Sequence, residues 1–132
     1  NVGQSTITYD YDLVISRKTV GVDSAIRVRV YYTPFYYDSI TKEYDINGNY
    51  TDYAKPRTGG NGLPEVDPDN RTMTNFAASG SVMEGTVSGF KPGDISKITV
   101  VIWIEGNDPD CTDDILGGEF KVDMVMNVVA AD

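Results

Sequence analysis

The chain has 132 residues, a formal net charge of −9, one cysteine and no histidine. This length fits a single domain, residues 1–132, that can bury a core without disulfides or metals. The charge argues against nucleic acid and anionic membranes as partners, since both require a basic face. No apolar run approaches the roughly 18 residues of a membrane-spanning helix, so no membrane span is predicted.

Two segments near the N-terminus alternate apolar and polar residues, which is typical of half-buried strands. The first is STITYDYDLVIS, residues 5–16, and its apolar face consists of Ile7, Tyr9, Tyr11, Leu13 and Ile15. The second is SAIRVRVYYT, residues 24–33, in which the apolar positions face inward. We therefore expect Arg27 and Arg29 to face water.

Residues 41–80 are rich in Gly, Pro, Asn and Asp, which predicts a long surface loop or insertion. Within it, Asn47-Gly48 is a hairpin-turn signal.

Tyrosines are dense before and within this region, and aromatic side chains stack on sugars or fill protein interfaces. The candidate ligand surface is Tyr36, Tyr37, Tyr44, Tyr50 and Tyr53. The alternative is that these tyrosines fill the core and cover its edge.

Three further strands are predicted in the C-terminal half. Residues 81–90 form one, with Gly85 as a bulge or a point of close approach. The run KITVVIWI, residues 97–104, is almost entirely apolar and predicts a central strand buried on both faces. Residues 119–129 form the last strand. Seven to nine strands with no long helix predict an all-β fold, a sandwich or jelly-roll-like domain.

The absence of histidine removes the commonest general base and the usual zinc, copper and iron ligands. We therefore predict that the protein is not an enzyme, because acidic residues on a small β-domain are far more often solvated than catalytic.

Calcium is the one candidate cofactor. The spacing of a calcium loop is matched by Asp108, Asp110, Thr112, Asp114 and Glu119, although Asp113 stands where the loop requires glycine. The alternative is an acidic loop that caps a short helical turn at residues 112–116.

Residues 90–126 carry a family resemblance. The motifs are Trp103-Ile104-Glu105-Gly106, then Asp108-Pro109-Asp110-Cys111, then Gly117-Gly118. This stretch resembles secreted SipW-dependent proteins of Gram-positive bacteria, the TasA/camelysin-like group. The resemblance implies a jelly-roll-like domain in the extracellular matrix or at the cell surface. Because the chain begins at Asn1 rather than Met, we expect either that a signal segment was removed or that this sequence omits one.

The resemblance further implies a structural protein whose partners are other copies of itself, joined into filaments by donor-strand exchange. Both terminal strands, residues 5–16 and 119–129, have the period-2 pattern that donation needs. Our first choice of donor is the N-terminal strand, with the apolar face of residues 7–15 inserted into the neighbouring subunit. The alternative is a monomeric adhesin-like or carbohydrate-binding module that uses the tyrosine-rich surface to contact cell-surface or matrix components.

Overall fold

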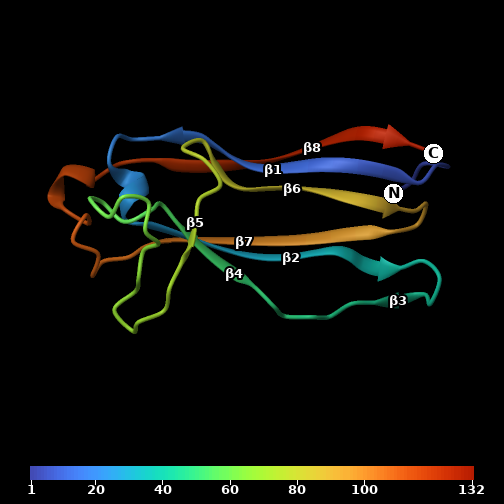
Figure 1. The fold of residues 1–132 in the computed structure, drawn as a ribbon, viewed down its shortest axis with the longest axis horizontal. Coiled ribbons are helices and arrows are strands. Elements are labelled where there is room, and N and C mark those ends of the chain that lie inside the picture. Colours follow the sequence, from blue (N-terminus) through green and yellow to red (C-terminus); the bar gives the residue numbers. More distant parts are fainter.

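The computed structural model describes the whole chain, residues 1–132, as two layers of β-strands (Figure 1). One layer is a three-stranded sheet in the order β6 (Ser81–Phe90), β1 (Ile7–Lys18), β8 (Phe120–Ala131). The other is a five-stranded sheet of β2 (Ile26–Asp38), β3 (Glu43–Tyr44), β4 (Thr51–Ala54), β5 (Thr74–Asn75) and β7 (Ile95–Ile104). The predicted all-β sandwich is confirmed, with eight strands.

The remaining regular structure is two single 3₁₀ turns. The first, η1 (Val22–Ser24), follows β1, and the second, η2 (Asp113–Ile115), precedes β8. The second turn confirms the short helical turn predicted at residues 112–116. No helix in the structure has the length and apolarity needed to cross a membrane.

Strand β1 lies at the centre of the three-stranded sheet and pairs antiparallel with both neighbours. Its residue Tyr11 lies opposite Gly85 of β6 and Met126 of β8. A Cβ atom added to Gly85 would collide with the Tyr11 ring. The predicted close approach at Gly85 is therefore confirmed, because a glycine is what allows the tyrosine to cross onto the neighbouring strand.

Strand β2 organises the second sheet. It pairs with β7 along one side, and with β4 and β3 in turn along the other. Strands β3 and β4 do not pair with each other, so the hairpin predicted at Asn47-Gly48 is wrong: the segment between them is a connection along one edge of β2. Three short strands thus interrupt residues 41–80, which are not one continuous loop.

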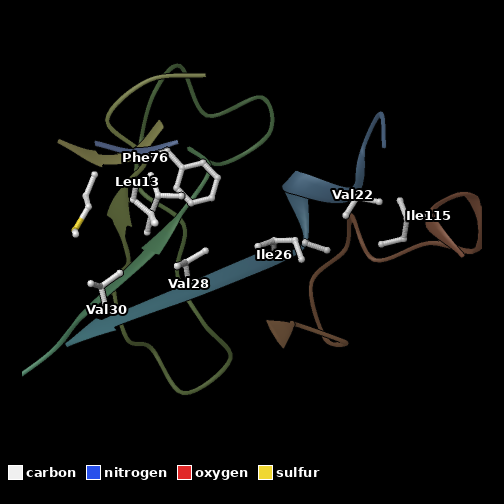
Figure 2. Packing of buried hydrophobic residues seen from close by; sticks show 10 residues of the cluster. Leu13, Val22, Ile26, Val28, Val30, Phe76 and Ile115 are labelled. Atoms are coloured by element: carbon white, nitrogen blue, oxygen red, sulfur yellow. The ribbon is translucent and has the colours of Figure 1, made fainter. Parts of the chain in front are cut away.

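The core lies between the layers. Figure 2 shows side chains from β1, β2, η1 and η2 in the main cluster. Its largest fully buried side chains are Leu13, Val28 and Val82. A smaller cluster of Tyr9, Val87 and Phe90 lies beyond it. The alternate residues of β1 and β2 that the sequence assigns to the interior therefore do form the core, as expected from the period of two.

Strand β7 departs from its prediction. Residues 97–104 were expected to form a central strand buried on both faces, but β7 pairs only with β2 and is an edge strand. Of its residues, Val101, Ile102 and Ile104 are all exposed. An apolar run of β-branched residues predicts a strand correctly, but it does not determine whether two neighbours are present to cover that strand.

Candidate functional site: an open edge and an aromatic face

One side of the sandwich ends in two long strands that each have a single hydrogen-bonded neighbour. Strand β8 has 12 residues and pairs only with β1, and β7 has 10 residues and pairs only with β2. An edge strand leaves a row of backbone N–H and C=O groups without a partner. We call the side of the sandwich formed by β7 and β8 the open edge.

Apolar side chains of the open edge point inward but are not covered. Ile102 lies opposite buried Val28 in the ladder, so the two share the interior face, yet Ile102 is 39% exposed and Ile104 is 52% exposed. On β8, Met126 and Val128 occupy interior positions and are 45% and 63% exposed. The interior of the sandwich is therefore not closed along this side.

A groove lies on the open edge, at the end of the sandwich where β7 begins and β8 ends. It has a volume of about 360 Å³, and its apolar lining is Ile7, Tyr9, Phe90, Ile95, Met126 and Val128. Its polar wall is internally satisfied, because the Tyr9 hydroxyl lies 2.6 Å from the Ser96 hydroxyl, which donates to the Pro34 carbonyl at 2.7 Å. The groove thus offers apolar surface beside polar groups that already have partners.

The residues predicted to be donated to a neighbour lie inside their own chain. Ile7, Tyr9, Tyr11, Leu13 and Ile15 belong to β1, which is hydrogen-bonded on both sides. Of these, Leu13 is 1% exposed. The structure therefore places this segment within its own sheet rather than at a surface, because its alternating pattern is satisfied by β6, β8 and the facing layer.

A second surface lies on the outer face of the five-stranded sheet. Two cross-strand pairs, Tyr31 with Thr99 and Thr33 with Lys97, form its floor. A cavity of about 330 Å³ lies over them, and its remaining lining is Tyr36, Asp45, Ile46, Asn47 and Gly48. The chain between β3 and β4 thus forms a wall beside the outward-facing side chains of β2 and β7.

The tyrosines predicted as a ligand surface divide into groups. Tyr36 and Tyr37 each pack against Tyr44, with ring centroids 5.1 Å and 4.8 Å apart. Tyr50 packs instead against Tyr31, at 5.3 Å. Tyr53 packs against the main core cluster, and burial raises its pKa. The structure therefore brings together only part of the predicted set.

Sequence reasoning missed the role of Arg27, which lies two positions before Arg29 on β2. Its guanidinium was expected in water, but its side chain is 1% exposed. Its Nε donates to Asp67 at 3.1 Å and its Nη2 donates to Asp108 at 2.7 Å. Burial lowers the pKa of Arg27, but the hydrogen bonds to these two carboxylates outweigh that effect and raise it.

The ionic cluster extends outward from Arg27. Arg71 binds Asp67 at 2.9 Å and Asp52 at 3.3 Å, and Asp52 also accepts two hydrogen bonds from Arg29. These contacts hold residues 64–73 and the loop after β7 over the outer face of β2. Alternation of Arg with apolar residues was the only sequence signal, and it could not reveal that distant loops cover one arginine more completely than the other.

The predicted calcium ligands are held apart by other partners. Asp108 binds Arg27, Asp110 accepts a hydrogen bond from the Thr58 hydroxyl at 2.6 Å, and Glu119 pairs with Arg17 at 3.3 Å. Thr112 and Asp114 lie at η2. No group of three or more acidic or cysteine side chains in the structure is arranged to hold a metal ion. The spacing of the sequence motif therefore does not become a gathered set of ligands.

Comparison with known proteins gives no relative: no family model, no curated protein and no solved structure matches the chain.

Proposed function

We propose that this protein is a secreted structural subunit of a Gram-positive bacterial surface or extracellular matrix, and that copies of it assemble into filaments by strand addition at the open edge. The observation that carries the proposal is the exposure of inward-pointing apolar side chains on both β7 and β8. The location outside the cell rests on the resemblance of residues 90–126 to secreted SipW-dependent proteins.

Strand addition requires free backbone groups and pockets for alternate side chains, and the open edge offers both. An incoming strand would hydrogen-bond to β7 or β8 and direct alternate residues onto Ile102, Ile104, Met126 and Val128. Burying that surface stabilises association by about 25 cal/mol for each Å² of apolar area removed from water.

The composition of β7 also supports this proposal. Monomeric proteins commonly protect long edge strands with charges, prolines or bulges. In β7 the only charged residue is Lys97, and there is no proline between Ile95 and Ile104. The strand is therefore poorly protected against pairing with another chain.

The strand that is added at the open edge would come from a neighbouring copy. Exchange of β1 between copies is a different mode of assembly: it would fill the gap that β1 leaves between β6 and β8, in the middle of the sheet, and the open edge would stay uncovered. We therefore assign the acceptor surface to β7 and β8 and treat exchange of β1 as the competing mode of assembly.

The test is to place a charge at an inward-pointing position of the open edge. We expect the unmodified protein to form filaments in negative-stain microscopy and large species in sedimentation velocity. Val128→Lys and Ile104→Lys should each yield monomers with an unchanged circular dichroism spectrum, because an inward charge blocks strand addition. Val20→Lys is the matched control, since Val20 is 94% exposed but lies outside the open edge.

Two results would contradict the proposal. One is an unmodified protein that stays monomeric at every concentration. The other is a filament that the two open-edge variants still form as readily as the Val20→Lys control.

A further inference from the structure

The cavity on the outer face of the five-stranded sheet is bounded below by two paired strands and at one side by a loop that is hydrogen-bonded to β2. Its floor is formed by Tyr31, Thr33, Lys97 and Thr99 on neighbouring strands. Its wall, residues 45–48, is tied to β2 because the Asp45 N–H donates to the Tyr36 carbonyl at 2.6 Å. The Asp45 carboxylate then accepts from the Asn47 N–H at 2.8 Å, which fixes the turn of the wall.

Several polar groups in the cavity form no ion pair or hydrogen bond within the chain. The Lys97 ammonium is one of them; its contact within the chain is with the Tyr36 ring, whose centroid lies 4.7 Å from Nζ. The side-chain amide nitrogen of Asn47 and the hydroxyls of Thr33 and Thr99 also make no hydrogen bond in the structure. Donors and acceptors therefore converge on one space between two aromatic side chains.

The balance of charge favours an uncharged ligand. The lining contains one cation, Lys97, and one anion, Asp45, so the cavity has no net charge. The chain as a whole carries a net charge of −9, which repels anionic ligands. The volume of about 330 Å³ lies at the small end of the range for ligand sites, about 300–1,000 Å³.

We propose that this cavity binds a neutral carbohydrate, a gluco-configured pyranose chain. The flat C–H face of such a sugar packs on an aromatic ring, and its hydroxyls both donate and accept hydrogen bonds. Tyr31 and Tyr36 supply the aromatic surfaces. Lys97 and Asn47 supply donors, while Asp45 and the threonine hydroxyls supply acceptors.

This site is independent of assembly at the open edge. A strand added beside β7 would lie in the plane of the sheet, whereas the cavity lies above its outer face. Binding can therefore be measured on the Val128→Lys variant, so that failure to bind sugar and failure to assemble are separate results.

The test is titration calorimetry, with saturation-transfer NMR, using two named probes: cellotetraose and triacetylchitotriose. We expect at least one probe to bind, and its affinity to fall by about tenfold or more in Tyr36→Ala and in Lys97→Met. Lys91→Met is the matched control, because Lys91 is an exposed lysine in the turn before β7 and outside the cavity. The Lys91→Met variant should bind the probe with the same affinity as the unmodified protein.

Melting curves establish that each variant is folded before its affinity is compared. The proposal is overturned if neither probe binds the folded protein. It is also overturned if Tyr36→Ala and Lys97→Met bind as tightly as the Lys91→Met control.

Discussion

Arg27 and Asp108 are separated by 81 positions in the chain, yet the Arg27 Nη2 donates to the Asp108 carboxylate at 2.7 Å with both side chains almost fully buried. The contact ties the loop after β7 to the middle of the fold. Because Nε of the same guanidinium donates to Asp67, Arg27 holds two loops over the outer face of β2.

Replacing Arg27 is expected to destabilise the protein strongly. Arg27→Met leaves the carboxylates of Asp67 and Asp108 buried without this cation, which costs about 3–5 kcal/mol. Arg27→Lys should also destabilise, because one ammonium group cannot reproduce the two directed hydrogen bonds of the guanidinium. Urea unfolding measures both effects. The control is Arg17→Met, whose pair with Glu119 is exposed and is worth about 0–1 kcal/mol; an equal loss in both variants would contradict the prediction.

Asp23 should make stability depend on pH. Burial raises the pKa of Asp23, but hydrogen bonds and charges from Lys18 and Lys55 outweigh burial and lower it below the ordinary value of 3.8. A lowered folded-state pKa means that the stabilisation is present above pH 3.8 and is lost as the pH falls through the folded-state pKa. We expect Asp23→Asn to be less stable than the unmodified protein at pH 7, by about 1–3 kcal/mol.

The difference in unfolding free energy between Asp23→Asn and the unmodified protein should narrow as the pH falls below 3.8. Urea midpoints measured across this range provide the check. A gap that stays constant with pH would show that the loss comes from packing and not from the charge of Asp23.

Gly85→Ala is expected to destabilise the sheet by about 1–3 kcal/mol, because the added methyl group collides with the Tyr11 ring. Thermal unfolding measures the loss. Gly80→Ala is the control, since a Cβ atom there has no neighbour within 4 Å. A second change, Tyr11→Ala, should make the Gly85 substitution nearly neutral; if it does not, the collision is not the cause.

A disulfide can distinguish strand addition from exchange of β1. Asp10 and Thr86 lie opposite each other on β1 and β6, and the Thr86 hydroxyl donates to the Asp10 carboxylate at 2.7 Å. With Cys111 replaced by alanine, Asp10→Cys and Thr86→Cys should form a bond within one chain. We expect dissolved filaments to give monomers on a non-reducing gel. A covalent ladder would instead show that β1 is exchanged between subunits.

Deletion of residues 1–15 is a less informative experiment. It removes most of β1, the central strand of the three-stranded sheet, so we expect an unfolded chain rather than an assembly-deficient monomer. Loss of filaments after that deletion would not identify a donor.

Calcium is expected to leave the melting temperature unchanged, because Asp108, Asp110 and Glu119 already have partners within the chain. Differential scanning fluorimetry with added calcium and with chelator measures this. An increase in melting temperature that depends on calcium concentration would contradict the prediction.

Much of the fold could be predicted from the sequence, but much of the candidate site could not. Alternation identified β1 and β2 and their interior residues, since successive side chains of a strand point to opposite faces. It could not show that Tyr53 faces the core while Tyr36 borders a cavity, because that depends on how β3 and β4 align along β2.

The sequence by itself determined the class of fold and the residue chemistry: alternating strands, turns rich in glycine and proline, and a chain without histidine. Only the tertiary structure decided that Arg27 is buried, that β7 is an edge strand and that the interior is open between β7 and β8. The physical reason is that periodicity is a local property of one strand, whereas burial depends on which distant segments come to lie beside it.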